Sequence, residues 1–149
     1  MNALSLPQLP CMCANFRRAT RAITQLYEEE LRPAKLRGTQ FTLLQALWLA
    51  GEVTQGELGR ILAMDSTTLT RTLAVMHRRG WIAKRHGTDR REWRLGLSKA
   101  GKAQFKRAFP YWERAQARLR KQLGDSQWNE LMKLTDLVTN AITKQGGTS

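Results

Sequence analysis

One stretch in the middle of the chain places the signals of two short helices and a hairpin in a fixed order. Thr54 and Glu57 have the spacing of a capping box, in which each side chain accepts a hydrogen bond from the other residue's backbone amide, so a short helix begins there. Residues 63–65 form a turn, and a second helix covers residues 66–79. Two short runs of strand-forming residues around a turn predict a hairpin over residues 81–97. This order is that of a winged helix-turn-helix.

The predicted helix of residues 66–79 has two chemically different faces. One face is apolar and is expected to pack on the core; it carries Leu69, Leu73 and Met76. The opposite face combines small polar side chains with arginines: Ser66, Thr67, Thr70, Arg71 and Arg78. The major groove of DNA is about as wide as one helix, and these side chains have the groups that bind base edges or phosphates. We therefore predict them as the DNA-binding recognition helix; the alternative is an ordinary surface helix.

The turn of the predicted hairpin is strongly basic, although nothing in the fold of a hairpin requires this. Its tip contains Asp89, Arg90 and Arg91. Arginine suits the narrow, electronegative minor groove of DNA. Asp89 is expected to be an acceptor that orients Arg91. We predict these three residues as a DNA-binding wing; the alternative is a solvated loop with a chance ion pair.

The charge of the chain agrees with a polyanionic partner. Lys and Arg number 25 against 12 Asp and Glu, which gives a formal net charge of +13. This balance favours nucleic acid as the partner, with an anionic membrane surface second; the alternative is a basic but inert surface. We find no apolar stretch long enough to span a bilayer and no pattern of a secretory signal. We therefore expect a cytoplasmic protein without a membrane partner.

Three amphipathic helices are predicted to flank this central stretch. The first has Pro10 at its first position and ends before Pro33, and the second runs from its cap Ser98 to about Leu123 with a bend at Pro110. The last helix has a full apolar stripe: Trp128, Leu131, Leu134, Val138 and Ile142. A helical bundle shared between two chains would cover this stripe, so we predict a homodimer. The alternative is packing of all three helices within one chain.

The predicted fold is mainly α with a small β-hairpin wing: a winged helix-turn-helix joined to a helical dimerisation region. We assign residues 39–97 to the DNA-binding domain. Residues 10–38 and 98–144 together form the predicted dimerisation region. Residues 1–9 and 145–149 are predicted to be a flexible lead and a flexible tail.

The run from Thr54 to Gly101, TQGELGRILAMDSTTLTRTLAVMHRRGWIAKRHGTDRREWRLGLSKAG, resembles the MarR (multiple antibiotic resistance regulator) family. The wing signature of that family is Asp-x-Arg followed by a strand and Leu-Thr-x-x-Gly. It matches Asp89, Arg91, Leu97, Ser98 and Gly101, with Ser98 in place of the common Thr. The flanking helices extend the resemblance to about residues 10–144. The resemblance implies a homodimer with interlocked first and last helices, bound to a pseudo-palindromic operator in double-stranded DNA. It also implies repression that a small aromatic ligand or an oxidant relieves.

Two cysteines stand at the start of the first predicted helix, where the backbone amide dipoles favour a thiolate. Cys13 falls on the apolar stripe with Phe16 and Tyr27, whereas Cys11 is expected to face water. The chain is also similar to the organic-hydroperoxide regulators of the family. Cys13 stands where their reactive cysteine stands and Tyr27 where a tyrosine partner stands, but Arg17 replaces a second tyrosine. We treat Cys13, Cys11 and Tyr27 as a candidate redox or effector site; the alternative is a pair of inert thiols.

The sequence has no nucleophile–base pair, no paired carboxylates and no Gly-rich phosphate loop. His77 and His86 lack metal-ligand spacing, so we expect no catalysis, no metal and no cofactor. The predicted function is sequence-specific DNA binding that controls transcription, as a repressor. The alternative is an architectural or RNA-binding protein that coats nucleic acid without promoter specificity. Such a protein would lose its site to excess random DNA, whereas a regulator would keep it.

Overall fold

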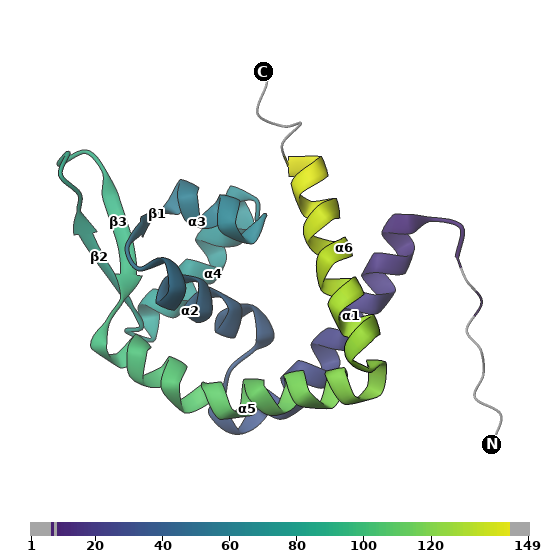
Figure 1. The fold of residues 1–149 in the computed structure, drawn as a ribbon. Coiled ribbons are helices and arrows are strands. Elements are labelled where there is room, and N and C mark those ends of the chain that lie inside the picture. The colour runs from purple at the N-terminus through teal and green to yellow at the C-terminus, as the bar shows by residue number, and fades with distance from the viewer. Residues whose placement is uncertain (1–6, 8, 144–149) are drawn as a thin grey trace.

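The computed structural model describes residue 7 and residues 9–143, so most of the predicted lead and the whole predicted tail lie outside the described residues. The elements follow in this order: α1 (Met12–Leu31), the 3-10 helix η1 (Arg32–Ala34), α2 (Gly38–Ala50), β1 (Val53–Thr54), α3 (Gln55–Leu62), α4 (Ser66–Arg78), β2 (Ile82–His86), β3 (Trp93–Leu97), α5 (Lys99–Leu123) and α6 (Asp125–Thr143). Helices dominate, and a hairpin projects at one end (Figure 1). The predicted fold class, mainly α with a small β wing, is confirmed.

The small sheet is antiparallel, with strand order β1-β3-β2. β2 and β3 form the predicted hairpin, in which His86 lies opposite Trp93. β1 adds a third strand that the sequence does not predict. It has only two residues and forms by pairing with β3, where Val53 lies opposite Leu95. Strand-forming composition cannot reveal so short a strand, because the pairing partner lies far along the chain.

A single apolar core joins the winged elements to α5. Its buried side chains include Leu31, Phe41, Leu44, Leu47, Leu58, Leu69, Leu73, Met76, Leu95 and Phe105. The ring of Phe105 on α5 stacks on Phe41 and Trp48 of α2, with centroids 5.6 and 4.9 Å apart. Aromatic pairs at such distances add to the stability that burial alone gives. The predicted domain boundary between residues 97 and 98 stays a prediction, since this packing crosses it.

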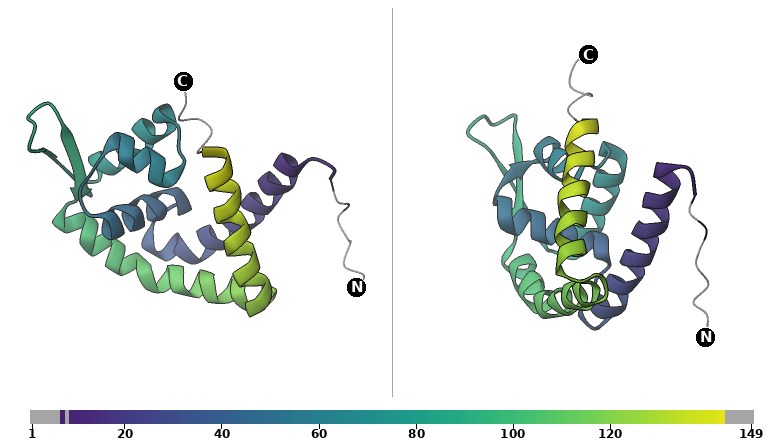
Figure 2. Two further views of the ribbon diagram at one scale, coloured as in Figure 1. Left: turned by 45° about the horizontal axis from the view of Figure 1, so that its top comes forward. Right: turned by 45° about the vertical axis from the view of Figure 1, so that its right-hand side comes forward.

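Helix α5 links the two ends of the molecule. Its cap is the predicted one, because the Ser98 hydroxyl accepts a hydrogen bond from the Gly101 amide at 3.0 Å. The helix then continues through Pro110 as one element. It passes beneath the winged elements and reaches α1 and α6 at its far end (Figures 1 and 2). Within the described residues, we find no helix whose length and apolar character would let it cross a membrane.

The apolar stripe of α6 is not covered by the other residues that the structure describes. Leu131, Leu134, Val138 and Ile142 are between 38% and 69% exposed, and Trp128 is half-buried. Helices α6 and α1 both pack against α5. Packing of the three flanking helices within one chain therefore leaves this stripe open to solvent.

Candidate nucleic-acid interface

Helix α3 begins at the predicted capping box. The Thr54 amide donates to Glu57 Oε2 at 2.8 Å, and the Glu57 amide donates to Thr54 Oγ1 at 3.2 Å. The hydrogen bond from the Thr54 backbone, followed by that from its hydroxyl and the charge of Arg94, lowers the pKa of the Glu57 carboxyl. Glu57 therefore carries its negative charge at the N-terminus of α3, where the helix dipole favours an anion.

A tight turn connects α3 to α4. Ala63 closes α3 in the left-handed conformation, with φ at 48°. Asp65 then caps α4, because its carboxylate accepts from the Thr68 amide at 2.8 Å and from the Thr68 hydroxyl at 2.6 Å. The hydroxyl bond, followed by the amide bond, lowers the pKa of Asp65. The cap fixes where α4 starts, and so fixes which side chains stand at its exposed N-terminal end.

The two faces of α4 are divided as the sequence predicts. Leu69, Leu73 and Met76 are buried. The five predicted recognition residues are exposed: Ser66, Thr67, Thr70, Arg71 and Arg78. The first four gather on the N-terminal turns, and Arg78 lies about 10 Å further along the helix axis than Arg71.

Gln55, the first residue of α3, also belongs to this surface. Its side-chain amide donates to the Thr70 hydroxyl at 2.9 Å, which ties the start of α3 to the outer face of α4. The sequence analysis did not identify Gln55. Its spacing from Thr70 becomes meaningful only when the angle between the two helices is known.

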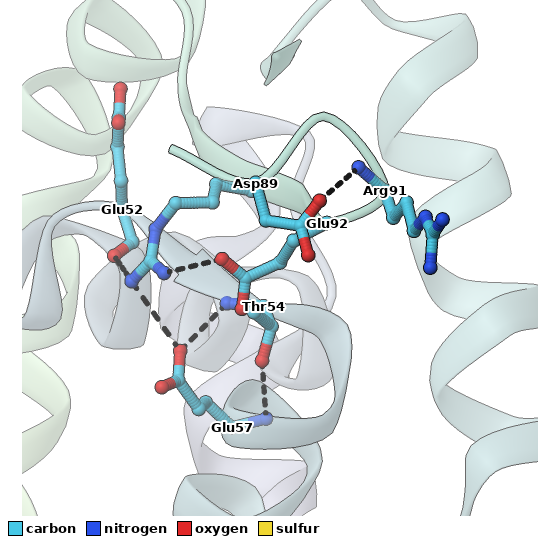
Figure 3. A network of polar contacts seen from close by, with 7 residues as sticks. Glu52, Thr54, Glu57, Asp89, Arg91 and Glu92 are labelled. Carbon is cyan, nitrogen blue, oxygen red and sulfur yellow. Dashed lines mark hydrogen bonds and ion pairs between the residues drawn. The ribbon is translucent and has the colours of Figure 1, made fainter. Parts of the chain in front are cut away.

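The tip of the wing is a hydrogen-bonded turn. The Gly87 amide donates to the Glu92 carbonyl at 2.8 Å, and the Glu92 amide donates to the Asp89 carbonyl at 3.0 Å. Asp89 Oδ1 accepts from the backbone amide of Arg91 at 2.9 Å. Asp89 is thus an acceptor for Arg91, but for its backbone rather than its guanidinium, which points away from the carboxylate (Figure 3). Arg90 and Arg91 are both exposed.

Arg94 on β3 joins the wing to the helix-turn-helix. Its guanidinium donates to the Glu52 carbonyl at 3.0 Å and to Glu92 at 3.3 Å, and lies 3.6 Å from Glu57 of the capping box. Arg85 on β2 pairs with the Glu52 carboxylate. Figure 3 shows the Glu52 backbone carbonyl and the carboxylates of Glu57 and Glu92 around this guanidinium. The wing is therefore held against the N-terminus of α3, and the two predicted DNA-binding parts form one unit.

The other face of the hairpin carries an aromatic and cationic group of side chains. Trp93 is 45% exposed, and its ring centroid lies 3.8 Å from that of His86. The Lys84 ammonium lies 4.7 Å from the Trp93 ring. The sequence alone does not reveal this group, because the strand register that brings Trp93 opposite His86 comes from the length of the turn.

The candidate redox residues do not meet within one chain. Cys11 and Cys13 are both exposed. Cys11 is the N-cap of α1, in extended backbone, so it does not lie on the helix. Cys13, which the sequence places on the apolar stripe of this helix, is therefore not covered within the single chain. Tyr27 lies about 21 Å further along the same helix.

Tyr27 is instead part of the contact between α1 and α5. Its hydroxyl donates to Gln116 Oε1 at 2.5 Å. Burial raises the pKa of Tyr27, so the hydroxyl keeps its proton and can donate this bond at neutral pH. Over the described part of the chain, no group of three or more His, Cys, Asp and Glu side chains is placed to hold a metal ion.

The known proteins that this chain resembles are transcriptional regulators. A family model described as the MarR family matches residues 35–92. The uncharacterised HTH-type transcriptional regulator YwoH of Bacillus subtilis is 31% identical over 87 residues, which cover 58% of this chain and 64% of that protein. The matched segment therefore spans less than two thirds of that relative.

Solved structures agree over most of the chain. The transcriptional regulator MosR of M. tuberculosis, solved in complex with DNA, is 34% identical with a TM-score of 0.80, over 90% of this chain and 97% of that one. A mutant MarR from E. coli, complexed with operator DNA, is 23% identical with a TM-score of 0.77, over 85% of this chain and 92% of that one. At 23% identity, the similarity to the E. coli protein supports only a shared fold.

Proposed function

This chain belongs to the MarR family of transcriptional regulators, and from that membership we propose that it binds specific sequences in double-stranded DNA through α4 and the wing. The observation that carries the proposal is the exposed polar face of α4, backed by buried Leu69, Leu73 and Met76. A helix divided in this way can enter the major groove with its N-terminal turns first. In this proposal Arg71 reads a base edge and Arg91 enters the neighbouring minor groove.

A two-fold homodimer completes the proposed reading surface. The uncovered stripe of α6 supports it, because an apolar helix face of this length is stabilised by a partner helix. In a dimer, the two copies of α4 would lie roughly 34–36 Å apart, one turn of the DNA helix. The operator would then be a pseudo-palindrome with two half-sites.

The experiment that tests the function is selection of bound duplexes from a random DNA library, followed by competition with excess random DNA. A regulator keeps its selected site, whereas an architectural or RNA-binding coating protein loses it. Arg71→Ala is expected to cost about 1–3 kcal/mol on the selected site and to relax its specificity. Arg32→Ala is the matched control, since Arg32 is exposed on η1, outside α4 and the wing. An equal loss of affinity for selected and random DNA would show that Arg71 contacts only phosphate.

Arg91→Ala is expected to weaken DNA binding about tenfold or more while the protein stays folded. Removing one contact to phosphate or minor groove should also reduce the slope of log affinity against log salt by about one. Filter binding or fluorescence anisotropy over a salt series measures both. Lys106→Ala removes the same charge from α5 and should leave the slope unchanged.

Substitutions of Asp89 separate the shape of the wing tip from its charge. Asp89→Ala removes the acceptor for the Arg91 amide, so DNA binding should weaken more mildly than in Arg91→Ala. Asp89→Asn keeps an oxygen acceptor and should bind more tightly than Asp89→Ala. Wild-type affinity in both Arg91→Ala and Asp89→Ala would show that the wing does not contact DNA.

We further propose that DNA binding represses transcription and that an effector relieves it. A cavity of about 310 Å³ supports a small-molecule effector. It is bounded by α1, α2 and α5, and it reaches the turn between α3 and α4. An occupant there would lie between the flanking helices and the reading helix, where it could change the spacing of the two copies of α4.

An oxidant is the second candidate signal, favoured by the exposure of both thiols at the start of α1. Oxidation of Cys13 would place a polar group or a bulky adduct where α1 is proposed to meet the partner chain. We expect an organic peroxide to release wild-type protein and Cys11→Ser from the selected duplex, but not Cys13→Ser, in an anisotropy titration. Release of all three proteins, or of none, would contradict a switch at Cys13.

A further inference from the structure

The cavity between α1, α2 and α5 is neutral, although it lies in a strongly basic protein. Not one described residue that lines it has a charged side chain. Its walls are aromatic at Tyr27, Phe41 and Trp112, and elsewhere consist mainly of aliphatic and threonine side chains. Charged residues make up 25% of the chain, so the absence of charge along this lining is a distinct property of the site.

Cations are present nearby but surround a different hollow. At the end of α1, a separate surface depression is lined by Arg32, Lys35, Arg37 and Arg79. No guanidinium or ammonium is among the groups lining the neutral cavity. A carboxylate that entered the cavity would find no cationic side chain to pair with, whereas a neutral polar group needs none.

From this lining we propose that the cavity selects neutral aromatic molecules and rejects aromatic carboxylates. The inference rests on the proposed effector-responsive function, and it adds the charge class of the ligand. Three aromatic rings provide stacking partners, and the Gln45 amide and the threonine hydroxyls can bind a neutral polar group. The volume of about 310 Å³ suits a bicyclic molecule.

The cavity also contacts the segment that sets the position of α4. Leu62 and Met64 line it, and they flank Ala63, the left-handed residue of the turn. A ligand packed against both side chains would press on this turn from the side of the flanking helices. Binding of a neutral aromatic molecule is therefore coupled to α4 through the turn itself.

The test compares 2-naphthamide with 2-naphthoate, which have nearly the same shape but differ in charge. Isothermal titration of the full-length protein at neutral pH should give at least about tenfold tighter binding of the amide. Gln45→Lys introduces a cation into the lining and should reverse this preference. Gln45→Met, a neutral side chain of similar length, removes the amide and should weaken binding of 2-naphthamide, but 2-naphthamide should still bind more tightly than 2-naphthoate. Equal or tighter binding of 2-naphthoate to the wild type, or no binding of either compound, would overturn the proposal.

DNA binding by the same protein samples separates this inference from the proposed function. If 2-naphthamide binds selectively but the protein selects no DNA sequence, the ligand class stands and the regulatory function fails. If the protein keeps a selected duplex but neither compound binds, the regulatory function stands and the inference fails. With both correct, 2-naphthamide should lower affinity for the selected duplex and 2-naphthoate should not.

Discussion

Gly101→Ala should destabilise the protein by about 3 kcal/mol or more, a large part of the stability of a small domain. A Cβ added at Gly101 would lie 2.1 Å from the Trp81 carbonyl oxygen and 3.0 Å from the carbonyl carbon. Both atoms belong to the backbone, so no flexible side chain can move aside. Urea unfolding followed by circular dichroism measures the loss, and the variant should also lose DNA binding at temperatures near its lowered midpoint.

The close contact between Gly101 and the Trp81 carbonyl lies where the start of α5 meets the segment between α4 and β2. The Ser98 amide donates to the Trp81 carbonyl at 3.0 Å, and the Ser98 hydroxyl donates to the Gly80 carbonyl at 2.5 Å. The start of α5 is thereby held against the segment between α4 and β2. Gly56→Ala is the matched control, because a Cβ there meets nothing within 4 Å and the residue is helical. A Gly101→Ala protein as stable as Gly56→Ala would contradict this account.

Glutamate at both Leu134 and Val138 should convert the proposed dimer into a monomer and weaken operator binding by at least about a hundredfold. The two side chains stand one helical turn apart on the uncovered stripe of α6, where they are 47% and 41% exposed. Burying two carboxylates against a partner helix is strongly unfavourable. Separation of the chains removes the gain in affinity, about 10²–10⁴-fold, that comes from linking two copies of α4 and its wing in one dimer.

Because Leu134 and Val138 are exposed within the chain, their replacement should leave each monomer folded. Light scattering after size exclusion reports the mass, and circular dichroism reports the fold. Asn140→Glu places a carboxylate on the opposite side of α6 and should remain dimeric. A wild-type protein that is monomeric at micromolar concentration yet binds its selected duplex tightly would rule out the dimer.

The sequence predicts those parts of the fold that depend on local spacing. The capping box of Thr54 and Glu57 and the cap Ser98 are where the pattern places them. The division of α4 into a buried and an exposed face also follows from spacing, because helix geometry assigns each residue a direction. These features need only neighbouring residues for their definition.

The parts that the sequence does not predict depend on contacts between distant segments. The Arg94 guanidinium interacts with Glu52, Glu57 and Glu92. These residues come together only after β1 pairs with β3. The exposure of Cys13 in the single chain has a related explanation. An apolar stripe indicates that a helix face can be buried, but it does not indicate which surface covers that face.

The length of α5 gives small changes at one end a large effect at the other. The helix has 25 residues, so it is about 37 Å long, and its first half is anchored in the core through Phe105. If α5 turns as a rigid lever by about 5° at the end near α6, its other end moves by about 3 Å, close to the rise of one DNA base pair. Each copy of α4 and its wing would then shift by about the rise of one base pair, without any rearrangement of the core behind it. A rotation of a few degrees would therefore be enough for the proposed effector to act.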